Sequence, residues 1–242
     1  MFERRWANGA LPGGPSASLL RFVVREGPFG KFLSEAELAR IERDLRTHEV
    51  DAGGHVAWRG DEVTHWVVVI EGMVKVEALA VDGRRTTLIS VTRAGWLGES
   101  ALLGDGRWPH DVIATHSSLL GLLPRATFDE LLANSLAFNR ALLGQLNARL
   151  RQFALRCEHE RLHHTREHVA HCLAELYDPW LYPGTRQRLT LSQDDVAHLA
   201  GVSRPTAHRA LHDLETQGLL SVAYGTITVH DPAALQQQAS RT

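Results

Sequence analysis

The sequence predicts an α+β fold in which a β domain and a smaller helical domain are joined by one long helix. Three observations carry this prediction. Short β-branched runs separated by glycines fill residues 49–123, a pattern typical of a small barrel or jelly roll. Residues 125–163 carry apolar side chains at helical spacing. Residues 164–242 combine helical segments with a short hairpin signal. The chain has 242 residues, of which 44% are hydrophobic, enough for two such cores.

The N-terminal segment is predicted in two parts. Residues 1–30 are expected to form a flexible lead, since residues 8–18 are rich in Gly, Pro and Ser. Ser34 and Glu37 then stand three positions apart in a capping-box pattern, which predicts a short helix through about Leu45. This helix opens the β domain, which is expected to span residues 31–124.

The β domain is predicted from runs of Val, Ile, Leu and Thr that are separated by glycine-containing turn signals. Many short strands at this spacing favour a jelly roll over a single open sheet. Strands are expected at residues 65–70, 73–79, 86–91 and 112–123.

The long helix carries a narrow apolar stripe. Polar residues flank this stripe, among them Arg149 and Gln152. A symmetric two-stranded coiled coil explains a narrow stripe with polar flanks better than packing on the chain's own barrel, so residues 125–163 are predicted to form a dimerisation helix. The stripe follows alternating spacings of three and four, the a and d positions of a heptad, at Leu136, Asn139, Leu143, Leu146, Leu150, Phe153, Cys157 and Glu160.

The C-terminal domain contains two helices with a tight turn between them. Ser192 predicts the N-cap of the first helix, and Ser203 predicts the N-cap of the second. Gly201 suits a left-handed residue in the turn between them. Residues 221–229 carry two short strand signals around a glycine. This order is typical of a winged helix-turn-helix, which places its second helix in the DNA major groove.

Side chains at the start of the second helix are expected to face DNA. The apolar residues of this helix take the inward positions, which leaves Arg204, Thr206 and Arg209 pointing outward toward base edges and phosphates. Cap residues are expected to contact phosphates through hydroxyl, amide and backbone groups. The predicted DNA-binding residues are Ser192, Gln193, Ser203, Arg204, Pro205, Thr206 and Arg209.

Composition narrows the classes of partner. The net charge of −2 argues against a purely electrostatic binder of nucleic acid or membrane. No apolar run reaches the roughly 18 residues of a transmembrane helix, and the N-terminal residues lack a hydrophobic signal core. Two cysteines form no disulfide framework. A cytoplasmic location with no membrane partner is therefore expected.

The chain resembles the family of bacterial regulators that includes the cyclic-AMP receptor protein and Fnr. The resemblance covers nearly the whole chain after the first 30 residues and rests on residues 70–76 (IEGMVKV), 95–103 (GWLGESALL) and 201–206 (GVSRPT). It implies a homodimer that binds a pseudo-palindromic site on double-stranded DNA. It also implies contact with RNA polymerase and allosteric control by a small-molecule effector in the β domain.

In that family, a segment that begins with Gly-Glu holds a cyclic phosphate on backbone N–H groups, and an Arg-Ser pair about ten residues on completes the site. Gly98 and Glu99 match this cassette. The Arg-Ser positions, however, fall on Pro109 and His110, which offer no guanidinium fork. An adenine-contacting position of the family falls on Phe153, which cannot hydrogen-bond a purine. The sequence therefore predicts an effector other than cyclic AMP bound in the usual mode.

The identity of the effector and of any cofactor stays open. A different ligand in the same cavity, such as another nucleotide or an organic acid, is one alternative, and regulation by abundance without any ligand is another. A third alternative is a cyclic nucleotide held by a shifted loop in which Arg107 supplies the charge. Another is haem, metal or redox sensing at a histidine-rich hinge, although the same segment fits an ordinary solvated hinge. The hinge contains His159, His163, His164, His168, His171 and Cys172. Candidate effector contacts are Gly98, Glu99, Ser100, Arg107, Trp108, His110 and Phe153.

An enzyme on a cupin-like barrel is the rival class. It would need a set of His and Glu metal ligands projecting from barrel strands. The histidines of the β domain lack that spacing, so the chain is expected to be a DNA-binding regulator and not an enzyme. These histidines are His55, His65, His110 and His116.

Overall fold

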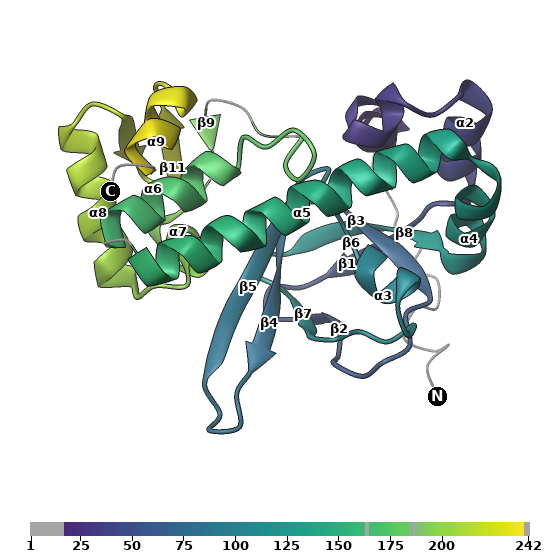
Figure 1. Cartoon of the computed structure of the whole chain (residues 1–242), viewed down its shortest axis with the longest axis horizontal. Coiled ribbons are helices and arrows are strands. Elements are labelled where there is room, and N and C mark those ends of the chain that lie inside the picture. Colours follow the sequence, from purple (N-terminus) through teal and green to yellow (C-terminus); the bar gives the residue numbers. More distant parts are fainter. Residues whose placement is uncertain (1–16, 163–164, 184, 186–187, 190, 240–242) are drawn as a thin grey trace.

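The computed structural model describes residues 17–162, 165–183, 185, 188–189 and 191–239 (Figure 1). It has the predicted order of a β domain, a long helix and a C-terminal helical domain. The β domain contains β1 (Arg46–Val50), β2 (His55–Ala57), β3 (His65–Glu71), β4 (Met73–Leu79), β5 (Arg85–Thr92), β6 (Trp96–Leu97), α3 (Glu99–Leu103), β7 (Asp111–Ala114) and β8 (Ser118–Pro124).

Two antiparallel sheets form the β domain, as the jelly-roll prediction requires. Within the described residues, each has four strands, in the orders β1-β8-β3-β6 and β2-β7-β4-β5. The predicted strand over 112–123 is two strands, because the chain leaves one sheet after Ala114 and enters the other at Ser118. Gly72 makes the turn from β3 to β4 at φ +88°, where a Cβ would clash with Ser118.

The N-terminal segment differs from the predicted flexible lead. Residues 17–30 fold into α1 (Ala17–Arg21), a π-helical turn η1 (Phe22–Glu26) and most of the 3-10 turn η2 (Pro28–Lys31), while residues 1–16 lie outside the described part. Val23, Val24 and Phe29 are buried in the same core as the β domain. The ring of Phe29 meets Trp66 edge-on, with 4.8 Å between ring centroids. Apolar contacts with β3 therefore order a segment whose composition resembles a loop.

The predicted capping box is confirmed at α2 (Glu35–Asp44), where Ser34 and Glu37 exchange side-chain and backbone hydrogen bonds. The predicted single helix over 125–163 is instead two helices, α4 (Arg125–Asn134) and α5 (Leu136–Leu162). Ser135 separates them in an extended conformation, and its hydroxyl accepts a hydrogen bond of 3.0 Å from the Phe138 amide. The Ser135 hydroxyl thereby satisfies the Phe138 amide, which lies in the first turn of α5 and has no acceptor within the helix.

The C-terminal domain has the predicted helix-turn-helix and wing, together with a short strand that was not predicted. Strand β9 pairs with β11, so the described part of the wing is a three-stranded sheet in the order β10-β11-β9. The elements are α6 (Thr165–Glu175), β9 (Arg188–Leu189), α7 (Gln193–Ala200), α8 (Arg204–Thr216), β10 (Leu220–Ala223), β11 (Thr226–Val229) and α9 (Pro232–Ala239).

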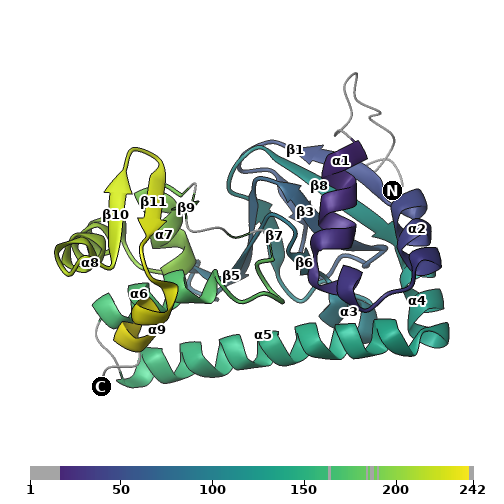
Figure 2. The ribbon, with the colours of Figure 1, turned by 90° about the horizontal axis from the view of Figure 1, so that it is seen from above.

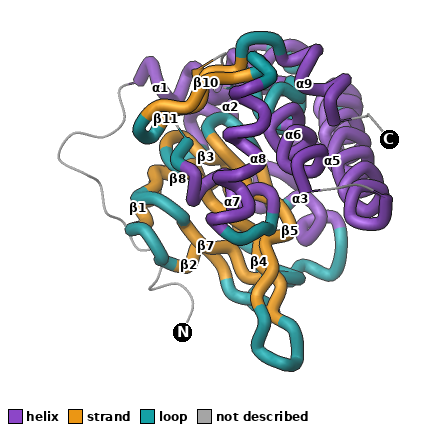
Figure 3. Tube along the Cα trace, turned by 90° about the vertical axis from the view of Figure 1, so that its left-hand side faces the viewer, coloured by secondary structure: helices purple, strands orange, loops and turns teal. Residues whose placement is uncertain are grey.

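Both domains lie on the same side of α5, which runs along one edge of the molecule (Figure 2). The C-terminal domain also packs against the β domain directly, with α7 beside β5 (Figure 3). Helix α5 therefore connects the two domains, and both domains pack against it. Among the described residues, no helix combines the length and the apolar character needed to cross a membrane.

Candidate functional site

The first helix of the helix-turn-helix begins and ends as predicted. Ser192 caps α7: its hydroxyl accepts a hydrogen bond of 3.2 Å from the Asp195 amide, and its own amide donates to the Asp195 carboxylate at 2.7 Å. Gly201 ends the helix in the left-handed region at φ +63°. Two reciprocal cap bonds and a glycine turn fix the angle at which the chain enters α8.

The start of α8 presents charge to solvent. Ser203 caps the helix, with Pro205 in the first turn. Arg204 and Arg209 are exposed, and Arg204 makes an ion pair with Asp194 at 3.2 Å. Thr206 is half-buried, and its hydroxyl lies 2.7 Å from the Ser203 hydroxyl. The structure thus brings the predicted α8 residues together at one end of the helix.

The predicted stripe on α5 is an exposed apolar face. Leu136, Leu143 and Leu150 are 65%, 65% and 69% exposed, and Phe153 is 39% exposed. Asn139 and Leu146 are half-buried and Cys157 is exposed, while the side chain of Glu160 lies outside the described set. Large apolar side chains aligned on one helix face without a neighbour are a sign of an interface.

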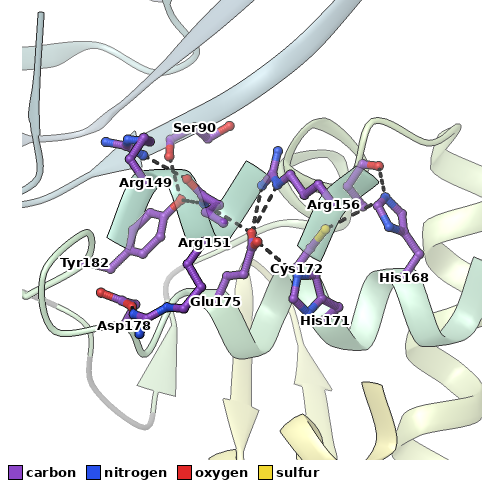
Figure 4. Close-up of polar contacts among 12 residues, drawn as sticks. Ser90, Arg149, Arg151, Arg156, His168, His171, Cys172, Glu175, Asp178 and Tyr182 are labelled. Atoms are coloured by element: carbon purple, nitrogen blue, oxygen red, sulfur yellow. Dashed lines mark hydrogen bonds and ion pairs between the residues drawn. The ribbon is translucent and has the colours of Figure 1, made fainter. Parts of the chain in front are cut away.

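The polar residues that flank the stripe do not all face solvent. Arg149 is 8% exposed and Gln152 is 3% exposed, because both lie on the face of α5 that packs against the two domains. Arg149 and Gln152, which the sequence marks only as polar flanks of the stripe, are therefore buried within their own chain. They belong instead to a buried polar group, the junction cluster, which consists of Arg149, Gln152, Arg156, His171, Glu175 and Tyr182 (Figure 4).

Glu175 of α6 is the centre of the junction cluster. Arg156 donates to it at 2.9 Å, His171 contacts it at 3.0 Å, and Gln152 donates to it at 3.2 Å. The side chain of Glu175 is only 7% exposed. Burial acts to raise the pKa of this carboxyl, but the hydrogen bond with His171 and the charge of Arg156 outweigh it, so the pKa is lowered.

Tyr182 links the junction cluster to the β domain. Its hydroxyl accepts a hydrogen bond of 3.0 Å from Gln152 and donates one of 2.9 Å to the Ser90 carbonyl of β5. A second contact joins the β domain to the C-terminal domain: His116 of the β7–β8 turn is 3.3 Å from the carboxylate of Asp195 in α7. The orientation of the C-terminal domain is therefore fixed by the backbone of β5, by His116 in the β7–β8 turn and by side chains of α5.

The residues that resemble the family cassette lie at the start of α3. Gly98 adopts φ +102° at the start of α3, and Glu99 is 4% exposed. The Trp108 indole packs so closely on Gly98 that a Cβ there would lie 2.9 Å from it. The Arg107 guanidinium donates to the Gly60 carbonyl at 2.8 Å, outside the cassette.

The remaining predicted effector residues lie apart from one another. Ser100 is exposed. Burial, aided by the nearby charge of Arg59, lowers the pKa of the His110 imidazole. Phe153 lies on the exposed face of α5 and does not reach the β domain of its own chain. The structure therefore does not gather the seven predicted effector residues into one site.

A cavity of about 320 Å³ that is open to solvent lies in the β domain instead. Of the predicted effector residues, only Trp108 lines it. His55 and His65 also line the cavity, although their spacing in the sequence does not fit a set of metal ligands. The residues that sequence reasoning missed come from separate strands, so no local motif marks them. The lining residues are His48, His55, Val56, Ala57, Trp58, Asp61, Glu62, Thr64, His65, Val67 and Trp108.

The histidine-rich hinge is only partly described. His163, His164 and the side chain of His159 lie outside the described set. His168 contacts the Ala200 carbonyl at 2.8 Å, and His171 belongs to the junction cluster. In the described part of the chain, no three His, Cys, Asp or Glu side chains are grouped as metal ligands.

Comparison with known proteins agrees with this architecture. Residues 47–135 match the cyclic nucleotide-binding domain, and residues 164–238 match the Crp-like helix-turn-helix domain. The transcriptional regulator LdrP of Thermus thermophilus is 31% identical over 186 residues, which are 75% of this chain and 90% of LdrP. The cyclic AMP receptor protein of the same organism is 27% identical over 187 residues, 77% of this chain and 85% of that protein.

Solved structures share the fold. FixK2 from Bradyrhizobium japonicum superimposes with a TM-score of 0.69 at 19% identity, covering 82% of this chain and 98% of that one. TTHB099, a CRP-family regulator from Thermus thermophilus, gives a TM-score of 0.56 at 28% identity, covering 81% and 97%. A cyclic nucleotide-binding-type β domain on a long helix with a helix-turn-helix defines a two-domain transcriptional regulator. The chain belongs to the CRP/Fnr family of transcriptional regulators.

Proposed function

We propose that the protein acts as a homodimer that binds a pseudo-palindromic DNA site of two half-sites about one helical turn apart. The observation that carries this proposal is the exposed apolar face of α5, on which Leu143 and Leu150 lie one heptad apart. Pairing two such faces about a twofold axis removes apolar surface from water and sets two α8 helices on one duplex.

Each subunit would place α8 in a major groove. Arg204 and Arg209 supply charged donors for guanine edges and phosphates, and Thr206 supplies a hydroxyl and a methyl group. Ser192, Gln193 and Ser203 lie at the two helix starts, where amides and hydroxyls suit phosphate oxygens. Pro205 offers no side-chain donor or acceptor, so the base opposite it is read by shape or by its neighbours.

Effector control would act through the contacts between the domains. A ligand in the β domain that favours one position of α5 would shift the population between two orientations of the DNA-binding domains. The junction cluster and the His116–Asp195 contact are the bonds that such a shift has to rearrange. A transcriptional regulator controlled in this way would act in the cytoplasm and would contact RNA polymerase.

Operator selection followed by anisotropy tests the DNA assignment. A site selected from random duplexes is expected to be palindromic. The Arg204→Ala, Arg209→Ala double variant should bind it about 100-fold more weakly, since each lost base contact costs roughly 1–3 kcal/mol. Arg43→Ala is the matched control, because Arg43 is an exposed arginine on α2. Full sequence specificity in the double variant would refute the assignment.

A cyclic-nucleotide effector is the second candidate, and one observation favours it. The Oε2 atom of Glu99 is buried and has no hydrogen-bond partner among the described residues, as expected of a carboxylate that waits for a ligand hydroxyl. Calorimetry with cyclic AMP and cyclic GMP decides between a cyclic-nucleotide effector and a different ligand. Micromolar binding that is lost in Glu99→Gln supports this candidate, and no binding supports a different ligand.

A further inference from the structure

The open cavity in the β domain is lined, within the described part of the chain, by two carboxylates and by no Lys or Arg side chain. We propose that it is the effector site and that it takes a small organic cation, an amine or ammonium compound, held by Asp61 beside the indoles of Trp58 and Trp108. The proposal rests on the proposed function, in which the β domain senses an effector, and it names where the effector binds and what its chemical class is.

The charge of the cavity lining selects against anions. Asp61 and Glu62 are the ionisable acids of the lining, and no Lys or Arg side chain lines it. The two nearest arginines have other roles: Arg107 binds the Gly60 carbonyl, and Arg59 is exposed to solvent. Carboxylates without a basic partner in a partly desolvated cavity attract a cation and repel a phosphate or carboxylate ligand.

Two of the three histidines in the lining, His48 and His65, do not reverse this charge. Burial lowers the pKa of the His48 and His65 imidazoles, which favours their neutral form near neutral pH. A neutral imidazole can accept a hydrogen bond from an ammonium group. Thr64, whose hydroxyl lies 2.8 Å from Nδ1 of His65, fixes the orientation of that ring. The polar lining therefore offers acceptors to a ligand that carries donors.

Two indoles add an aromatic contribution. His55 stacks on Trp58 with 3.3 Å between ring centroids and 8° between ring planes, so the Trp58 ring is held in place. Trp108 also lines the cavity and is buried against Gly98. Indole rings are the best side chains for cation–π contacts. A volume of about 320 Å³ is at the small end of the range for ligand pockets, which limits the ligand to a compact molecule.

Continuous contacts connect this cavity to α5. Trp108 packs on Gly98, the residue that directly follows β6. The carbonyl of Trp96 in β6 accepts from Gln145 and from Arg149 at 3.4 Å each. Arg149 in turn donates to Gln152 at 3.0 Å, inside the junction cluster. A ligand that displaces Trp108 therefore acts on the strand that α5 holds.

Calorimetry on the full-length protein tests the proposal. Benzylamine and 1,4-diaminobutane serve as cationic probes, and benzoate and cyclic AMP serve as anionic ones. We expect a cationic probe to bind at one site per chain, and Asp61→Asn to weaken that binding about tenfold or more. Asp51→Asn is the matched control, because Asp51 is exposed in the turn after β1 and does not line the cavity.

The possible outcomes separate the two proposals. Binding of neither cation, preference for benzoate in the same cavity, or unchanged affinity in Asp61→Asn would overturn the cation site. If Asp61→Asn is unfolded by circular dichroism, Trp58→Leu, an exposed position, replaces it and should also weaken binding. Operator binding is measured on the same samples. If the wild-type protein binds its operator but neither amine, the result counts against the cavity alone, whereas amine binding by a protein that binds no specific operator counts against the DNA-binding role alone.

Discussion

The two faces of α5 differ from those of a helix that packs only within its own chain. The face turned away from both domains carries Leu136, Leu143 and Leu150 in solvent. The face packed against the domains buries apolar residues such as Phe138 and Leu142, but it also buries the polar side chains of Gln145, Arg149, Gln152 and Arg156. On a helix that packs only within its own chain, the large apolar side chains would face the core. The exposed leucines support the proposed pairing with a second chain, while the buried polar side chains set the position of two domains.

One face of α5 is expected to stabilise the association of two chains, and the other is expected to hold the two domains of one chain in position. The exposed leucines gain free energy only when a second copy covers them, so they control assembly. The buried polar groups gain little net stability, because desolvation offsets most of their attraction, but each hydrogen bond is satisfied in only one arrangement of the domains. Changes on one face should therefore alter association, and changes on the other should alter the stability and orientation of the DNA-binding domain.

The largest effect is expected on the exposed face. Leu143→Arg with Leu150→Arg places like charges at the centre of the proposed interface, so the dimer should dissociate and operator binding should fall more than about 100-fold. Sedimentation and anisotropy measure the two results. The control, Leu143→Met with Leu150→Met, keeps the face apolar and should remain dimeric. If the arginine variant stays a dimer, the interface lies elsewhere.

The next effect is expected at the centre of the buried face. Arg156→Met leaves the buried Glu175 carboxylate without its arginine, which should lower the free energy of unfolding by about 3 kcal/mol or more. The double variant Arg156→Met, Glu175→Met removes both charges and should be more stable than Arg156→Met alone. Urea denaturation of the four proteins of this cycle measures the coupling. Additive losses would show that the pair is not coupled.

A pH titration tests how much the buried Glu175 carboxylate contributes to the stability of the folded protein. The pKa of Glu175 is lowered in the folded protein, so its contribution is complete above the unfolded pKa of about 4.5 and is lost as the pH falls through the folded value. Wild type should therefore be more stable than Glu175→Gln at neutral pH, and the difference should shrink in acid. Thermal unfolding between about pH 7 and about pH 3 checks this. A constant difference would contradict it.

Sequence reasoning succeeded where the determinants are local. Ser192, Gly201 and Ser203 act within three or four residues of themselves, so the helix-turn-helix could be predicted nearly in full. The stripe on α5 could be predicted because its period is a property of one helix. The DNA-contact roles of these residues stay predictions.

The buried polar face could not be predicted, because its partners are distant in sequence. Tyr182 and Ser90 lie 92 positions apart, and Arg156 and Glu175 lie 19 apart. Nothing near Arg149 distinguishes it from a solvated arginine. The cavity shows the same limit, since its lining comes from several strands and loops. In the N-terminal segment, the apolar residues around Phe29 outweigh the loop-like composition before them.

The smallest effect tests the Tyr182 hydroxyl, which bridges α5 and the β domain through two hydrogen bonds. Tyr182→Phe keeps the buried ring but leaves the Ser90 carbonyl and one hydrogen-bonding group of Gln152 without their partner. Loss of these two bonds should cost about 1–2 kcal/mol and should not affect dimerisation, because Tyr182 contacts the buried face of α5 and Leu143 lies on the exposed one. Urea denaturation and sedimentation measure both. The comparison between the faces fails if Tyr182→Phe changes association, since the two faces would then be coupled through the helix.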